Sequence, residues 1–190
     1  MSKLRHWLSE LFARRYSMSE RRMFAFLRQN VLFRQLSDHE LMAFVPHLYE
    51  RVYGKNEVIF FRNDPSQAFY LIKQGRVRLT LDTDTGFERL VVLSRYHYFG
   101  ENAFLYRSNR LYNAVSISER TEVYAIPQVH LSEIFEDEPD IRSKILEALA
   151  GTYAQQLHRV FRAYSAAYGF FDLGRVCFAK PEDEAEDAEL

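Results

Sequence analysis

Between residues 57 and 126 the chain repeats one pattern, in which short runs of β-branched and aromatic residues end at turn residues. Such runs are typical of β-strands, because branched and aromatic side chains pack well on a pleated sheet. The stretch Arg76-Val77-Arg78-Leu79 alternates polar and apolar residues, as a half-exposed strand does. Short strands at this spacing predict an antiparallel sandwich or jelly roll. The expected strands are 57–61, 68–73, 76–81, 88–93, 113–117 and 122–126.

Helical patterns flank these strands on both sides. Ser37 and Glu40 have the spacing of a capping box, which predicts a helix running to about Leu48. After the strands, a short helix is expected over 129–135, and Pro139 suits the first turn of a long helix reaching about Tyr168. Apolar residues on the long helix recur three or four positions apart and form a stripe that needs a partner: Leu146, Leu149, Tyr153, Leu157, Val160 and Tyr164.

The two ends of the chain differ in charge, although the net charge is only −1. Residues 1–34 are basic, and we interpret their arginines as the solvated faces of helices over 3–15 and 19–31, with nucleic acid or an anionic membrane as the alternative. The first helix is amphipathic and is expected to dock on protein; a membrane-surface helix with Trp7 at the headgroups is the other interpretation. The acidic end, 181–190, is typical of a solvated tail.

Composition restricts the class of protein. A chain of 190 residues with 47% hydrophobic residues suits one domain with appendages, and it has no apolar run long enough to span a bilayer. Its single cysteine, Cys177, excludes an internal disulfide and a cysteine-cluster zinc site. Without a signal-peptide pattern, a cytoplasmic location is expected. The histidines lack metal-binding spacing and no nucleophile or P-loop motif is present, so we expect no catalytic residues, no metal and no enzyme.

The stretch from Tyr98 to Val115 carries the residues of an anion site. Gly100 allows a ligand to approach the backbone closely, and the amides of the short helical turn after it attract negative charge. Arg110 stands nine residues after Glu101 and could bind phosphate oxygens. A carboxylate beside a phosphate requires a hydrogen-bond donor, and a ribose hydroxyl is one. The pattern therefore predicts a ligand with both an anionic group and a hydroxyl.

This stretch resembles the phosphate-binding cassette of cyclic nucleotide-binding domains, in particular the sensor domains of catabolite-activator-like regulators. The residues that match the family pattern in type and spacing are Phe99, Gly100, Glu101, Ala103 and Arg110. The second half of the cassette departs from the pattern: Asn109 replaces the usual proline, Leu111 and Tyr112 replace small residues, and Asn113 replaces a Thr or Ser.

The resemblance extends over roughly residues 33–150. Gly75 matches a family glycine, while Asn56 and Asn63 stand near two others, and Asn tolerates the left-handed conformation best after glycine. The resemblance implies an α+β fold, an antiparallel β-roll (a double-stranded β-helix or jelly roll) flanked by N-terminal helices and a long C-terminal helix. The expected parts are a helical extension over 1–32, the β-roll over 33–136, the long helix over 137–169, and an aromatic segment with the acidic tail over 170–190.

The resemblance also implies a ligand, cAMP before cGMP, and no resident cofactor. Arg110 and the amides around Gly100 would hold the cyclic phosphate, and Glu101 would take the ribose 2′-hydroxyl. Residues on the long helix would meet the base, with Thr152, Tyr153 and Gln156 as candidates. The expected ligand-binding set is Gly100, Glu101, Asn102, Ala103, Arg110, Leu111 and Asn113.

Binding would move the long helix and signal to an unidentified protein partner or to a mate subunit in a homodimer formed through that helix. About twenty residues follow Gly169, too few for a helix-turn-helix module, so we expect no DNA binding through such a module. The alternative is a ligand-free scaffold or interaction module in which Leu111 and Tyr112 fill the pocket. An open cavity with Arg110 pointing inward would favour the receptor, and a filled one the scaffold.

Overall fold

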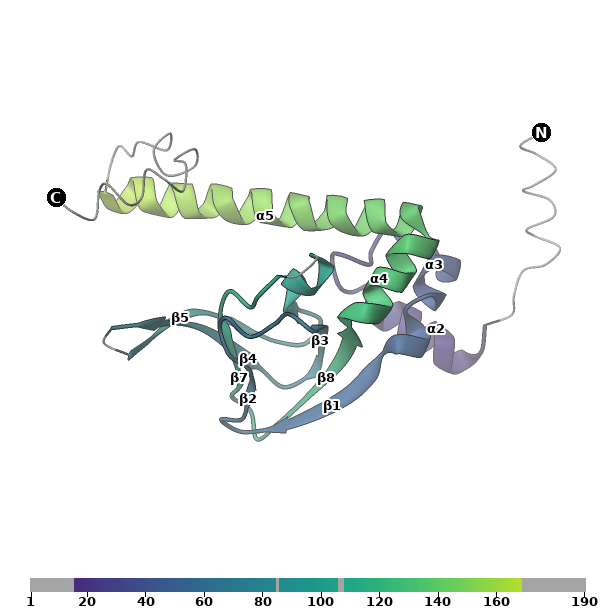
Figure 1. Cartoon of the computed structure of the whole chain (residues 1–190), viewed down its shortest axis with the longest axis horizontal. Coiled ribbons are helices and arrows are strands. Elements are labelled where there is room, and N and C mark those ends of the chain that lie inside the picture. Colours follow the sequence, from purple (N-terminus) through teal and green to yellow (C-terminus); the bar gives the residue numbers. More distant parts are fainter. Residues whose placement is uncertain (1–15, 85, 106–107, 169–190) are drawn as a thin grey trace. The chain divides into compact units, whose positions relative to one another are not determined.

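The computed structural model describes residues 16–84, 86–105 and 108–168 (Figure 1). By its internal contacts the chain forms two units, residues 1–146 and residues 147–190, which are described separately. The amphipathic helix expected over 3–15 and the segment expected over 170–190 lie outside the described residues.

The first unit is built on two antiparallel sheets, as the strand pattern predicts. One sheet has the strand order β1-β8-β3-β6 and the other β2-β7-β4-β5. The first comprises β1 Tyr49–Gly54, β8 Arg120–Pro127, β3 Ala68–Gln74 and β6 Tyr98–Phe99. The second comprises β2 Val58–Phe60, β7 Asn113–Ser116, β4 Val77–Thr83 and β5 Gly86–Leu93. The short β6 was not among the expected strands, because two residues show no periodicity.

Turn residues allow the chain to reverse between these strands. Asn56 and Asn63 have φ values of 64° and 68°, and Gly75 has 85°, so all three adopt the left-handed conformation expected for them. A Cβ at Gly75 would lie 2.7 Å from the carbonyl oxygen of Arg120. This position therefore requires glycine both for its backbone angle and for space.

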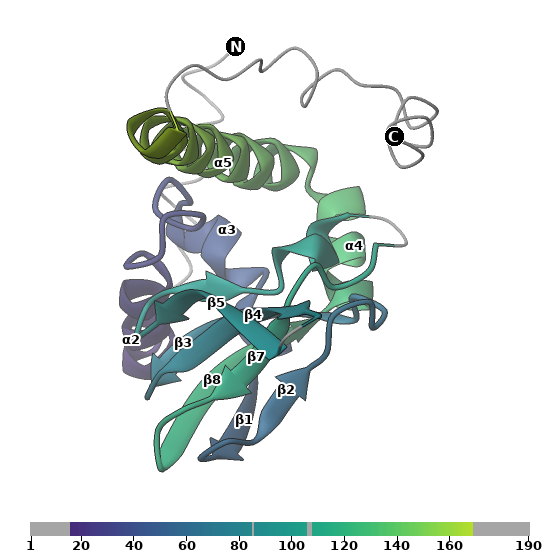
Figure 2. The ribbon, with the colours of Figure 1, turned by 90° about the vertical axis from the view of Figure 1, so that its left-hand side faces the viewer.

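The two sheets face each other across an apolar core (Figure 2). Ile72, Phe99 and Val123 from the first sheet and Val77 and Ala114 from the second are fully buried in it. The core also contains Phe60, Leu79 and Tyr112. Alternate residues of the paired strands point into this layer, and this places the intervening residues on the outer faces.

Two short helices precede the roll, α2 Met18–Leu27 and α3 Asp38–Met42. Both begin with the capping box that Ser17 and Ser37 form with a glutamate three residues later. The helix expected to reach Leu48 is shorter than predicted: α3 ends at Met42, and the 3-10 helix η1 Val45–His47 follows. Pro46 explains the break, because proline lacks an N–H and disfavours helical backbone before it.

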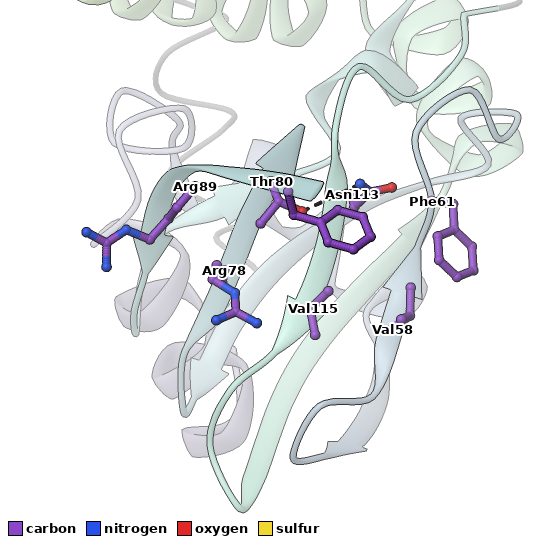
Figure 3. A pocket seen from close by; sticks show the side chains of 8 residues that line it. Val58, Phe61, Arg78, Thr80, Arg89, Asn113 and Val115 are labelled. Atoms are coloured by element: carbon purple, nitrogen blue, oxygen red, sulfur yellow. Dashed lines mark hydrogen bonds between the residues drawn. The ribbon is translucent and has the colours of Figure 1, made fainter. Parts of the chain in front are cut away.

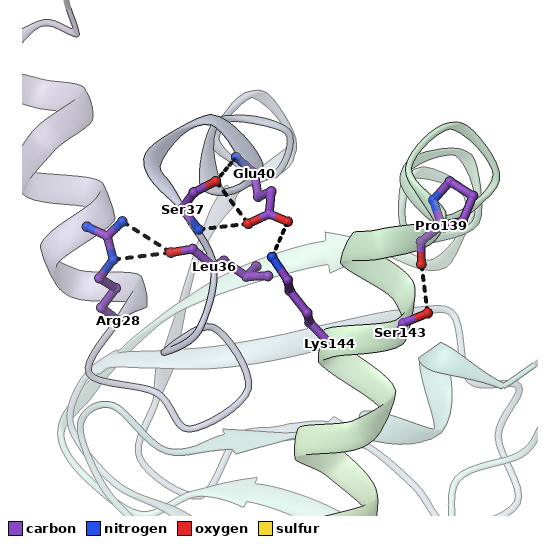
Figure 4. A network of polar contacts seen from close by, with 7 residues as sticks. All are labelled: Arg28, Leu36, Ser37, Glu40, Pro139, Ser143 and Lys144. Carbon is purple, nitrogen blue, oxygen red and sulfur yellow. Dashed lines mark hydrogen bonds and ion pairs between the residues drawn. The ribbon is translucent and has the colours of Figure 1, made fainter. Parts of the chain in front are cut away.

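After the sheets come α4 Gln128–Asp137 and α5 Pro139–Tyr168, close to the expected bounds. The first turns of α5 belong to the first unit and are joined to α3 by an ion pair of 2.6 Å between Lys144 and Glu40 (Figure 4). The same Glu40 carboxylate accepts the Ser37 hydroxyl and backbone N–H. The later part of α5 forms the described part of the second unit and exposes Leu157 and Val160.

Candidate functional site

Gly100 begins the cassette in the left-handed conformation, with φ 74° and ψ 29°. It precedes the 3-10 helix η2 Glu101–Phe104, so the predicted helical turn exists but is a tight one. A Cβ at Gly100 would lie 2.6 Å from Nη1 of Arg110 and 3.1 Å from the carbonyl oxygen of Ala68. The close approach that the sequence predicts at this glycine is thus to the chain's own arginine.

Arg110 points into the interior, where only 3% of its surface is exposed. Its Nη1 donates to the Ser66 hydroxyl at 2.8 Å and to the Gly100 carbonyl at 3.0 Å, and its Nη2 donates to the Ala68 carbonyl at 2.6 Å. The guanidinium carbon lies 4.1 Å from the centre of the Phe60 ring. Burial lowers the pKa of Arg110 from its ordinary value, although nearby acidic groups oppose that change.

These contacts leave a buried guanidinium bonded to neutral oxygens rather than to a phosphate. Neutral acceptors satisfy its N–H groups, and the aromatic face of Phe60 adds cation–π attraction. Such a guanidinium is a suitable partner for a phosphate, because hydrogen bonds between charged groups are stronger than hydrogen bonds between neutral groups.

Tyr112 occupies the space beside this arginine and is 8% exposed. Its hydroxyl donates to Oε2 of Glu101 at 2.6 Å and accepts the backbone N–H of Gly100 at 2.8 Å. These are the two groups predicted to receive the ribose hydroxyl and the phosphate. The tyrosine hydroxyl therefore takes the hydrogen-bonding positions that a nucleotide would need, as the ligand-free alternative requires.

The other cassette residues lie in three different environments. Asn102 and Ala103 are buried in η2, and Asn102 Oδ1 has no hydrogen-bond partner among the described residues. Leu111 is 61% exposed, so it does not fill the pocket. Asn113 is buried, but it accepts the Arg62 N–H at 2.8 Å and donates to Asp82 at 2.9 Å, away from Arg110.

Of the seven residues expected at the site, the structure brings five together around Gly100 and Arg110. Leu111 and Asn113 follow Arg110 in sequence, but their side chains point elsewhere. The candidates for the base, Thr152, Tyr153 and Gln156, lie on the part of α5 in the second unit, where the Thr152 hydroxyl donates to the Ala148 carbonyl at 2.9 Å.

The sequence did not identify Ser66 and the Ala68 carbonyl as partners of Arg110. Both lie more than forty residues before it and carry no motif. Tyr70 stacks on Phe99 with 4.9 Å between ring centres, and burial raises its pKa. The Tyr70 ring centre lies 5.6 Å from the guanidinium carbon of Arg110, and the pairing of β3 with β6 brings Phe99 against Tyr70.

The described residues offer neither a metal-ion cluster nor a membrane-spanning helix. No three His, Cys, Asp or Glu side chains among them lie close enough to hold a metal ion. None of the helices in the described ranges combines the length and apolar character needed to cross a bilayer.

This architecture is that of a β-roll binding domain. Two antiparallel sheets face each other, and a Gly-Glu turn lies beside a buried arginine. Residues 50–138 match the family model of the cyclic nucleotide-binding domain, and this part of the chain belongs to that family. The resemblance inferred from the cassette is thereby confirmed at the level of the family and the fold.

Curated relatives include the cyclic AMP receptor protein of Thermus thermophilus, 33% identical over 53% of this chain and 46% of the relative. The cGMP-dependent protein kinase of Toxoplasma gondii is 28% identical over 58% of this chain and 11% of the kinase. The chain therefore spans less than half the length of these two relatives.

Solved structures show the same fold. The catabolite activator protein of Thermus thermophilus is 25% identical with a TM-score of 0.62, covering 73% of this chain and 63% of that one. The sensor domain of the transcriptional regulator DNR from Pseudomonas aeruginosa is 19% identical with a TM-score of 0.63, covering 77% of this chain and 95% of that domain.

Proposed function

We propose that this chain is a regulatory receptor for a cyclic nucleotide, cAMP before cGMP, and not an enzyme. The observation that carries the proposal is the buried Arg110 guanidinium, which lies against left-handed Gly100 within a cassette of the family's spacing. Arg110 points into the roll and bonds to neutral oxygens there, and a phosphate would make stronger, charge-assisted bonds with it, which favours a role in recognising an anion. Relatives described as a cyclic AMP receptor and a cGMP-dependent kinase support the choice of ligand.

In this proposal Arg110 and the amides of Gly100, Asn102 and Ala103 hold the cyclic phosphate, and Glu101 accepts the ribose 2′-hydroxyl. The orphaned Oδ1 of Asn102 is a further acceptor within the same turn. Leu111 and Asn113 contribute only main-chain groups in this arrangement, because their side chains are directed elsewhere. No resident cofactor is involved.

Nucleotide binding must displace Tyr112, because its hydroxyl bonds to both Glu101 and Gly100. If closure by this side chain is worth about 2–4 kcal/mol, it weakens apparent nucleotide affinity by about 30- to 1,000-fold. The described arrangement is then the closed state of a two-state receptor, and the nucleotide shifts the population toward the open state.

We further propose that the open state signals through the C-terminal helix to a protein partner or to a mate subunit in a homodimer. The supporting observation is the exposed apolar stripe that includes Leu157 and Val160. The proposal includes a cytoplasmic location and excludes DNA as the partner of this chain.

A second candidate function is a ligand-free scaffold that interacts with proteins. The position of Tyr112 favours it, because the side chain fills the pocket and satisfies the groups that would bind a ligand. In this case the arginine serves only to hold Ser66, Ala68 and Gly100 together.

Calorimetric titration with cAMP and cGMP tests the two functions against each other. Tyr112→Ala introduces the small residue typical of the family, and Leu111→Ala is the matched control because Leu111 is exposed. A receptor predicts weak binding by the wild-type protein, about 30- to 1,000-fold tighter binding by Tyr112→Ala, and no change in Leu111→Ala.

Circular dichroism and thermal melts establish that Tyr112→Ala is folded, and Tyr112→Phe provides a milder variant. If neither the wild-type protein nor folded Tyr112→Ala binds either nucleotide, and millimolar nucleotide does not raise the melting temperature, the receptor is rejected and the scaffold remains.

A further inference from the structure

A cavity of about 370 Å³ lies on the outer face of the sheet β2-β7-β4-β5 (Figure 3). Val58 and Val115 provide an apolar floor, and Phe61 and Phe87 stand at its borders. Arg78 and Arg89 also line it. Its volume falls near the lower end of the roughly 300–1,000 Å³ typical of small-molecule sites.

Strand pairing separates this cavity from the cassette. Val115 pairs with both Val58 and Arg78, which places these three side chains in one row across the sheet. The neighbouring Ala114 belongs to the core between the sheets. Successive side chains of a strand point to opposite faces, so the cavity and the buried Tyr112 lie on opposite sides of the same sheet.

The polar side chains on the floor of the cavity already have hydrogen-bond partners within the protein. Thr80 and Asn113 pair across β4 and β7 and are both buried. The Asn113 amide donates to Asp82 and its oxygen accepts the Arg62 N–H. This network holds Thr80 and Asn113 in place on the floor. The Asp82 carboxylate at the edge of the cavity would repel an anionic ligand, but Asp82 is not among the residues that line the cavity.

Arg78 supplies a cation with an unused donor. Its Nε is buried and makes no hydrogen bond to the described part of the chain. A buried donor without a partner is rare, and the rest of the Arg78 side chain is only partly buried, so the guanidinium can meet a ligand in the cavity. Figure 3 shows the Arg78 side chain lying across the sheet toward Val115, while the Arg89 head group is directed away from the cavity. Arg78 is therefore the residue that selects an anion.

Phe61 and Phe87 present apolar ring surface to water beside the cavity. Phe61 is 57% exposed and Phe87 is 74% exposed. A contiguous exposed apolar patch is a feature of ligand-binding grooves. A flat aromatic group placed on Val58 and Val115 would remove apolar surface of both rings from water.

We propose that this outer cavity is a binding site for a small aromatic anion, with its carboxylate or phosphate on Arg78 and its ring between Phe61 and Phe87. The site is independent of the proposed nucleotide function, because none of its lining residues contacts the ligand in that proposal through its side chain. A cyclic nucleotide is itself an aromatic anion, so the test must separate the two sites.

The experiment is a titration of the full chain followed by two-dimensional amide NMR. The probes are benzoate and phenyl phosphate, which distinguish a carboxylate from a phosphate, and benzamide, which has the ring without the charge. We expect saturable shifts at the amides of 78–80 and 113–115, and none at 100–105. Arg78→Gln should weaken anion binding about tenfold or more.

Arg142→Gln is the matched control, because it removes the same charge from an exposed position on α5. It should bind benzoate as the wild-type protein does. Equal binding of benzamide and benzoate, or benzoate binding unaffected by Arg78→Gln, would overturn the proposal. Absence of any saturable response to the two anions would also overturn it.

Discussion

The substitution Tyr112→Phe removes a single oxygen atom from the centre of the cassette. The ring stays, so its packing at 5.9 Å from the Phe60 ring centre is kept. Two hydrogen bonds are lost, the one donated to Glu101 and the one accepted from the Gly100 N–H. The variant therefore isolates what the hydroxyl contributes to the folded state.

The expected loss of stability depends on how deeply the two partners of the Tyr112 hydroxyl, Gly100 and Glu101, are buried. Gly100 is buried, and its N–H, left without an acceptor, costs about 1–3 kcal/mol. Glu101 is half-buried and can recover part of its lost bond from water, so its share is about 0.5–1 kcal/mol. Together these predict a loss of about 2–4 kcal/mol in the free energy of unfolding, or about 4–16 °C in melting temperature for a chain of this size.

Urea denaturation followed by fluorescence and circular dichroism measures this loss. Tyr49→Phe is the control: Tyr49 is 41% exposed, and its variant should stay within about 0.5 kcal/mol of the wild-type protein. If Tyr112→Phe were as stable as Tyr49→Phe, the hydroxyl would not hold the cassette closed. A nucleotide would then not have to compete with the Tyr112 hydroxyl for Glu101 and Gly100.

Two further predictions concern backbone strain and pH. Gly100→Ala should lower the free energy of unfolding by about 2–4 kcal/mol in urea denaturation, because φ is 74° and the new Cβ would lie 2.6 Å from Arg110 Nη1. The control is Gly151→Ala, which has open space around it and should not be destabilised. Equal losses in the two variants would contradict the prediction. Burial and the charge of His130, whose ring stacks 4.2 Å from that of His47, lower the pKa of His47. Its folded pKa lies below the ordinary 6.5, so stability is fully present above that pH and falls as pH drops below it. His47→Gln should flatten this part of the stability curve between about pH 7.5 and about pH 5.5, and an unchanged slope would refute the assignment.

Local patterns were sufficient for most secondary structure. The strand runs, the capping box at Ser37 and the start of α5 at Pro139 depend on neighbouring residues, and the structure has each of them. The left-handed angles of Asn56 and Asn63 are likewise a property of those residues and their turns. The helix after Ser37 is shorter than predicted, because the capping box marks only its start and Pro46 prevents its continuation.

The candidate site could be predicted only in part. The spacing of Gly100, Glu101 and Arg110 indicated an anion pocket, and the structure places the three side by side. The neutral partners of Arg110 could not be predicted, since Ser66 and Ala68 reach it only through the fold. The outer cavity likewise exists because Val58, Arg78 and Val115 are aligned by the pairing of separate strands.

The sequence by itself determined the β-roll and the composition of its cassette, because strand periodicity, turn residues and motif spacing are local properties of the chain. Whether the cassette is open or closed was decided by the tertiary structure. Leu111 and Tyr112 are adjacent and both bulky, yet one is exposed and the other is buried against Phe60. Both lie in the bend just before β7, and the packing of the two sheets determines which of them faces the interior.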